Sequence, residues 1–153
     1  MALKSAGSSP AFPIIKYNHY AYVINHYNIL NSKKLKSKKI LKTVKTLKLV
    51  KALHYYGIIS NFLIVTSGPR NRHYITFSTP HFSNTTYFSS IRLVSTPSKA
   101  HTISINAIRL ATKSMGTSLI FLETSKGIIT HLDALRLNIT GRILCVVLFY
   151  VFW

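Results

Sequence analysis

The residues with the best prospects for chemistry lie in one short segment, Glu123-Thr-Ser-Lys-Gly127, between two apolar runs. It places two hydroxyls, a cation and a glycine on one tight loop. Hydroxyl groups both donate and accept hydrogen bonds, so they can engage 2′-OH groups and base edges in a shallow RNA minor groove. Lys126 would supply charge for phosphate, and Gly127 would let the backbone approach closely. The segment therefore indicates a nucleic-acid contact rather than catalysis.

Other kinds of site chemistry are poorly represented. The two acids, Glu123 and Asp133, do not form a convincing pair of catalytic carboxylates. The single cysteine, Cys145, lies within an apolar run and is expected to be a small core residue. The seven histidines have no metal-ligand spacing, and no phosphate-binding glycine-rich motif is present. We therefore expect a protein that is not an enzyme and that needs no metal or other cofactor.

The charge balance indicates the class of partner. Twenty Lys and Arg residues against two acids give a formal net charge of +18 over 153 residues. This imbalance opposes compaction unless a polyanion supplies the missing negative charge. Because 48% of the residues are hydrophobic, we still expect a folded core beneath the basic surface. Nucleic acid is the expected partner, with an anionic membrane surface as the alternative.

The first half predicts an αβαββ domain over residues 17–80, after an N-terminal extension over residues 1–16 that is either a weak transit peptide or a plain extension. Apolar spacings of three and four indicate helices, and the Gly-Pro turn at 68–69 indicates a hairpin. The expected elements are a helix over 17–31, a basic strand or helix approach over 33–42, a helix over 43–57, and strands over 58–66 and 72–78.

The second half predicts a β-rich domain with short helices over residues 91–153, joined to the first by a Ser/Thr/Asn-rich linker over residues 81–90. The overall fold class is therefore α+β. Thr130 and Asp133 are spaced as a capping box at a helix start. The expected elements are a strand over 101–105, a helix over 106–112, a strand over 117–122, a helix over 131–137 and a final strand after Gly141.

Basic residues of the first half are expected to contact phosphate. The stretch over residues 33–42 carries Lys33, Lys36, Lys38 and Lys39. From the end of this stretch through the helix that follows, Lys42, Lys45, Lys48 and Lys51 recur every three residues. A period of three drifts around a helix with 3.6 residues per turn, so these lysines spiral rather than form one face. With no acid nearby in sequence to neutralise them, they favour general phosphate contacts.

Residues 115–147, MGTSLIFLETSKGIITHLDALRLNITGRILCVV, closely resemble the C-terminal signature of the universal small-subunit ribosomal protein eight family. That signature has an apolar strand, a Ser-Thr-Ser-Lys-Gly loop, a Thr-Asp helix start, a Gly-Gly turn and a final strand with a cysteine. The segment Arg92-Leu-Val-Ser-Thr-Pro-Ser-Lys99 is similar to the family's basic Ser-Lys-Pro-Gly segment. The resemblance covers about residues 20–148 and is architectural before residue 91.

The resemblance implies a non-enzymatic protein that binds the central domain of small-subunit ribosomal RNA, supports its assembly and contacts neighbouring small-subunit proteins. The residues it assigns to RNA contact lie in the loop, the following turn and the basic segment upstream: Thr124, Ser125, Lys126, Gly127, Thr140, Gly141, Arg142, Arg92, Ser95 and Lys99. Three positions depart from the family pattern. Glu123 replaces a serine, Thr140 replaces the first glycine of the pair, and Arg142 replaces an acid.

The divergence and the Lys-, Ile- and Tyr-rich composition indicate an organellar ribosome, mitochondrial in preference to plastid. The alternative is a basic membrane-associated protein with an inserted aromatic C-terminus. The apolar end, residues 143–153, has eleven residues, whereas a spanning helix needs about 20. Its Val, Ile, Tyr and Trp content favours a buried strand instead.

Overall fold

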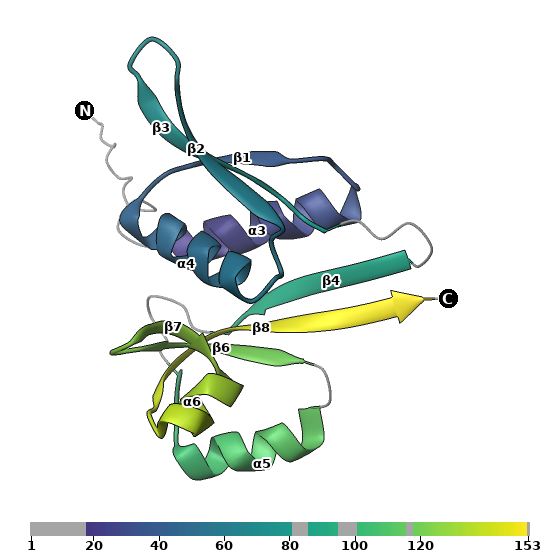
Figure 1. Cartoon of the computed structure of the whole chain (residues 1–153), viewed down its shortest axis with the longest axis vertical. Helices are drawn as coiled ribbons and strands as arrows, with labels where there is room; N and C mark the ends of the chain where they lie inside the picture. Colours follow the sequence, from purple (N-terminus) through teal and green to yellow (C-terminus); the bar gives the residue numbers. More distant parts are fainter. Residues whose placement is uncertain (1–17, 81–85, 95–100, 116–117, 153) are drawn as a thin grey trace, which may run out of the picture.

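The computed structural model describes residues 18–80, 86–94, 101–115 and 118–152. Figure 1 shows them as stacked layers, with one sheet, a pair of helices, a second sheet and a second pair of helices from top to bottom. Helices and antiparallel sheets alternate through the stack, which confirms the α+β fold class. Ser95 and Lys99 lie outside the described residues.

The first layers contain helices α3 and α4 and a three-stranded antiparallel sheet in the order β1-β3-β2. The bounds are α3 His19–Ser32, β1 Lys38–Leu41, α4 Val44–Tyr55, β2 Asn61–Ser67 and β3 Arg72–Ser78. The two predicted helices and the hairpin are confirmed, and the basic stretch resolves into strand β1. The β2 strand begins later than predicted, because the amides of Ile58 and Ile59 bond the carbonyl of Leu53 and complete the end of α4.

Capping residues in the sequence set the limits of these helices. Asn18 accepts hydrogen bonds from the amides of Tyr20 and Ala21 at the start of α3. Thr43 and Thr46 form a reciprocal capping box at the start of α4. Gly57 follows α4 with φ of +83°, a conformation that glycine adopts without strain. Side-chain caps therefore set the start of both helices, and Gly57 marks the end of α4.

The second sheet has the order β4-β8-β6-β7, with β5 also paired to β8. Its strands are β4 Thr86–Leu93, β5 His101–Ile103, β6 Leu119–Thr124, β7 Gly127–Thr130 and β8 Gly141–Phe152. Helices α5 Ile105–Met115 and α6 His131–Leu137 complete the second half. The α5 helix is longer than the predicted helix over 106–112. The predicted helix over 131–137 and the final strand are confirmed.

The linker predicted over residues 81–90 is wrong from residue 86 onward. Strand β4 occupies Thr86–Leu93 and pairs antiparallel with β8 from Thr86↔Phe152 to Leu93↔Cys145. The Ser/Thr-rich composition concealed a strand because threonine and serine fit a strand when a long partner provides the pairing. Residues 81–85 of the predicted linker lie outside the described residues.

The second sheet is buried on both faces. One hydrophobic cluster joins α3, α4 and the first sheet to Ile91, Phe121, Leu144, Cys145 and Val147 of the second sheet. A smaller cluster under α5 and α6 contains Ile108, Ile120, Leu122 and Ala134. The first cluster thus crosses the boundary between the two halves of the sequence.

The C-terminal apolar run is strand β8, as predicted, and Cys145 within it is buried. Burial raises the pKa of the Cys145 thiol to about 12, so the thiol stays protonated as a core group. In the described part of the chain, no helix is both long and apolar enough to cross a membrane.

Candidate nucleic-acid interface

The loop between β6 and β7 is a tight hairpin closed by the pair Thr124↔Gly127. The Thr124 hydroxyl donates to the carbonyl of Gly127 at 2.9 Å and accepts from the amide of Lys126 at 3.1 Å. Gly127 has φ of +102°, a backbone conformation that a residue with a side chain adopts only with strain. Ser125 and Lys126 are exposed at the tip. Thr124 and Gly127 therefore shape the loop, whereas Ser125 and Lys126 are free to face a ligand.

The turn over residues 140–142 lies directly against this loop. A Cβ atom on Gly141 would fall 2.4 Å from the carbonyl oxygen of Glu123 and 2.7 Å from Cγ2 of Thr124. Only a glycine lets the two backbones approach this closely. Thr140 is exposed beside it. The structure thus brings together two segments that are separated by the twelve residues 128–139 of the sequence.

Glu123 and Arg142 are paired across β6 and β8. The Arg142 guanidinium donates from Nη2 to Oε1 of Glu123 at 2.5 Å. The other carboxylate oxygen, Oε2, accepts from the Tyr20 hydroxyl of α3 at 2.6 Å. The carboxylate is therefore held by two donors, and one of its partners is a cation. A carboxylate next to phosphate would be repelled, and the ion pair with Arg142 offsets that repulsion.

The pKa values at this site follow from these contacts. Burial would raise the pKa of Glu123, but hydrogen bonds from Tyr20 and Arg142 and the charges of Arg142 and Lys48 hold the pKa below its ordinary value. Burial, followed by the Glu123 carboxylate, raises the pKa of the Tyr20 hydroxyl well above its ordinary value. Glu123 is thus ionised and Tyr20 is a protonated donor at neutral pH.

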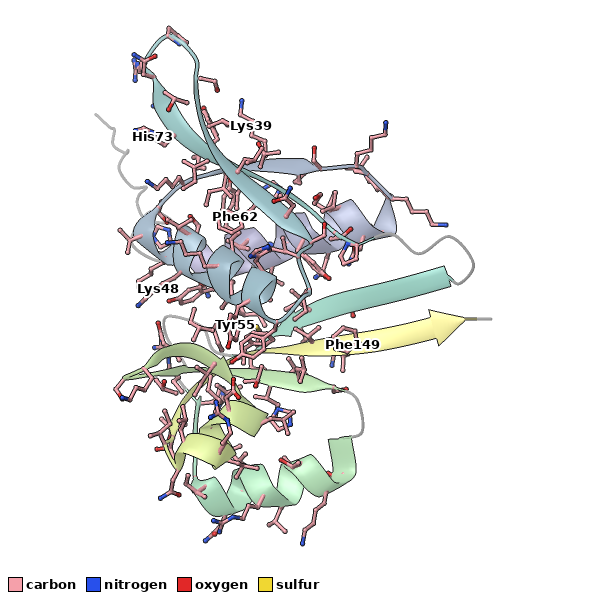
Figure 2. The ribbon with its side chains drawn as sticks, in the orientation of Figure 1. Lys39, Lys48, Tyr55, Phe62, His73 and Phe149 are labelled. Atoms are coloured by element: carbon pink, nitrogen blue, oxygen red, sulfur yellow. The ribbon has the colours of Figure 1, made fainter. Side chains whose placement is uncertain are left out.

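Lys48 and Tyr20 belong to this site although the sequence did not assign them to it. Lys48 is exposed on α4, and its charge acts on Glu123. Figure 2 shows Lys48 projecting on the side of α4 that faces the β6–β7 end of the second sheet. The period-three lysines of α4 predicted a phosphate contact for Lys48. No sequence pattern predicted the role of Tyr20, because its partner Glu123 is 103 positions away.

The other predicted residues lie elsewhere. Lys39 is on β1, where its ammonium group lies 4.3 Å from the centre of the Tyr74 ring and donates to Ser67 at 3.0 Å. Figure 2 places Lys39 in the first sheet, away from Lys48. Lys33 and Lys36 are exposed between α3 and β1, and Lys38 is half-buried on β1.

Arg92 is exposed on β4 and is separated from the loop and turn. It pairs in register with Val146 of β8, four residues beyond Arg142. Four residues of strand span about 13 Å. The structure therefore does not bring Arg92 into the cluster formed by the loop and turn.

Asp133, the second acid, joins α6 to α4. Its carboxylate accepts hydrogen bonds from the Tyr56 hydroxyl and from Arg136. Thr130 accepts from the Asp133 amide at 3.4 Å, which supports the predicted helix start. The Asp133 carboxylate thus links the two halves of the chain through Tyr56. Glu123 and Asp133 each bind separate partners, so they do not form a catalytic pair. Among the described residues, no group of His, Cys, Asp and Glu could hold a metal ion.

These features define a class of protein: a basic α+β protein suited to binding nucleic acid, in which the 124–127 loop and the 140–142 turn pack against each other at one end of the second sheet. The family model for ribosomal protein S8 matches residues 22–148, and the chain belongs to that family. It is a structural, rRNA-binding protein of the small ribosomal subunit and not an enzyme. No curated protein sequence matches the chain.

Proposed function

We propose that the chain binds the central domain of small-subunit ribosomal RNA through the loop–turn edge, defined as residues 124–127 and 140–142. The observation that carries this proposal is the packing of Gly141 on the backbone of Glu123. It holds the exposed Ser125, Lys126 and Thr140 on one edge of the second sheet. Such an edge offers hydroxyls and backbone groups to a minor groove, where RNA displays 2′-OH groups and base edges.

The lysines have a separate role in this proposal. Lys33, Lys36, Lys38, Lys39 and Lys48 are distributed over several elements and would neutralise phosphate without reading sequence. Arg142 would contact phosphate with the part of its guanidinium that Glu123 leaves exposed; its side chain is 38% exposed. Specific recognition would then depend on Ser125 and Thr140 rather than on the charged groups.

A binding titration of the full chain with a central-domain rRNA fragment tests the specific contact. Ser125→Ala is expected to weaken binding by about fivefold, which corresponds to one hydrogen bond of about 1 kcal/mol. Ser114→Ala is the matched control, because Ser114 is exposed on α5 and bonds only its own helix among the described residues. Equal binding of the rRNA fragment and an unrelated duplex at physiological salt would rule out the specific role.

The same titration at several salt concentrations tests the phosphate contacts. Lys48→Ala is expected to reduce the slope of log affinity against log salt by about 1 and to weaken specific and unrelated RNA alike. Lys113→Ala on α5 is the matched control, since Lys113 is exposed outside the proposed interface. An unchanged slope for Lys48→Ala would remove this lysine from the interface.

We further propose that the ribosome is organellar, with a mitochondrial one preferred to a plastid one. The support is the departure of Glu123, Thr140 and Arg142 from the family pattern, together with the Lys-, Ile- and Tyr-rich composition. Fractionation of source cells followed by sedimentation tests it. Recovery of the chain with mitochondrial small subunits is expected, whereas recovery with cytosolic or plastid subunits would contradict the proposal.

A further inference from the structure

Strand β2 forms an edge of the first sheet, and its sequence carries none of the usual protection of an edge. The sheet order is β1-β3-β2, and among the described residues β2 pairs with β3 alone. Asn61–Ser67 reads NFLIVTS, without charge or proline. Soluble proteins commonly protect such edges with lysines, prolines or bulges, because the unpaired amides and carbonyls attract other strands.

The opposite edge of the same sheet shows that protection. Strand β1, Lys38–Leu41, reads KKIL and places two lysines on four residues. The two edge strands belong to the same small sheet of the same basic chain, but only β1 carries charged side chains. An unprotected edge beside a protected one indicates that the β2 edge is covered when the protein is in use.

The side chains of β2 agree with this. Leu63 is 61% exposed and Ile64 is 46% exposed, although they point to opposite faces of the sheet. Ile64 shares its face with Ile40 and Ile75, both buried against the helices. Ile64 is more exposed than they are because no described strand lies beyond it. A neighbouring strand would bury apolar surface on both faces of β2 at once.

The charges around the β2 edge indicate which kind of molecule would pair with it. Arg72 lies on β3 beside the end of β2, and residues 18–80 contain no acid. A second copy of this chain would bring two chains of net charge +18 edge to edge, which is unfavourable. RNA phosphate would also suit Arg72, but RNA has no strand backbone to pair with the amides and carbonyls of β2. A protein strand with apolar and acidic side chains fits both properties of the edge.

We propose that an extended segment of a neighbouring small-subunit protein adds to β2 as a fourth strand of the first sheet. Its backbone pairs with the free edge of Asn61–Ser67. Its apolar side chains cover Leu63 and Ile64, and a carboxylate near the Ser67 end reaches Arg72. Adjacent strands lie about 4.8 Å apart, so Arg72 is about 10 Å from the added backbone, within reach of two extended side chains.

Photo-crosslinking in assembled small subunits tests the proposal. A photoreactive phenylalanine analogue replaces Leu63 in the full chain, and a matched version replaces Leu41, which is 39% exposed on the protected β1 edge. Position 63 is expected to crosslink to a protein segment that carries acidic residues, with a yield at least about five times that of position 41. Crosslinks from position 63 to rRNA alone, or to another copy of this chain, would overturn the proposal.

A charge insertion gives a second readout. Leu63→Lys is expected to reduce recovery of the crosslinked protein in purified subunits by about tenfold, because it adds the edge protection that β2 lacks. Leu41→Lys is expected to leave that recovery unchanged. Binding of both variants to the rRNA fragment reports that they are folded. Equal loss of the partner in the two variants, or no loss in either, would overturn the assignment of β2.

Discussion

Glu123 and Arg142 face each other across β6 and β8, joined by a hydrogen-bonded ion pair of 2.5 Å. The resemblance singled out both residues as departures from the family pattern, and the structure pairs their opposite charges. An acid at 123 would repel phosphate, and a cation at 142 would crowd the basic surface. Paired, their charges offset each other, which leaves Lys126 as the unpaired charge of the loop–turn edge among the described residues.

The interaction between Glu123 and Arg142 can be measured by a double-mutant cycle. Glu123→Gln is expected to lower the free energy of unfolding by about 1 kcal/mol, because the pair is partly exposed and screened. Arg142→Gln should have a similar effect. The coupling energy from urea unfolding of the double variant is expected to be about 0.5 to 1 kcal/mol. Strictly additive effects would mean that the two side chains do not stabilise each other in solution.

The pH dependence of stability should report the Glu123 carboxylate. Its folded-state pKa lies below the ordinary 4.5, so its contribution is fully present above about pH 4.5 and is lost as the pH falls through the folded-state pKa. The stability difference between the natural chain and Glu123→Gln is therefore expected at pH 7 and should shrink toward zero at acid pH. Because Asp133 is the only other acidic side chain, few other carboxyls obscure this titration. A stability difference that persists unchanged at acid pH would show that the Glu123 carboxylate is not its source.

The sequence was a good guide to the local elements because their signals are local. Thr43 and Gly57 bound α4 through contacts within a few residues, and the 124–127 loop closes on itself. The pairing of Glu123 with Arg142 has a different origin. The register between β6 and β8 shifts after Phe121, where a bulge in β8 brings Arg142, not Ile143, opposite Glu123. No pattern in either strand announces that shift, so the sequence identified both residues without showing that they touch.

Contacts between the halves were also outside the reach of sequence reasoning. The side chain of Asn28 on α3 donates to the carbonyl of Ile91 at 2.9 Å and accepts from the amide of Ile91 at 3.0 Å. The Asn28 side-chain amide therefore pairs with both backbone groups of Ile91, as the backbone of a neighbouring strand would. An asparagine in a helix gives no sign of this role, and strand β4 itself was partly predicted as linker.

This double hydrogen bond leads to a prediction at Asn28. Asn28→Ala is expected to lower the free energy of unfolding by about 2 kcal/mol, because two partly buried backbone groups lose their partner. Asn28→Asp should destabilise at least as much, since a carboxylate oxygen would face the Ile91 carbonyl. Urea unfolding measures both, and Asn25→Ala serves as the helix-propensity control, because Asn25 is exposed on the same helix. Equal stability of Asn28→Ala and the natural chain would show that β4 does not need this contact.

Gly141 and Gly127 allow the shape of the loop–turn edge to be tested by two alanine substitutions that act differently. Gly141→Ala places a methyl group 2.4 Å from the Glu123 carbonyl oxygen, so the two strands must separate locally. Gly127→Ala meets no atom within 4 Å but strains a backbone with φ of +102°. We expect Gly141→Ala to destabilise by about 1 to 3 kcal/mol, as overpacking does, and Gly127→Ala by about 1 kcal/mol.

The two glycine variants should also differ in RNA affinity at matched folded fraction. Gly141→Ala displaces the turn from the loop, so it is expected to weaken binding of the central-domain fragment by more than the Ser125→Ala variant does. Gly127→Ala changes the loop alone and leaves Thr140 and Arg142 in place. If Gly141→Ala bound the fragment as tightly as the natural chain, the close packing of turn and loop would be a feature of stability only, and Ser125 and Thr140 would not need a shared edge to recognise RNA.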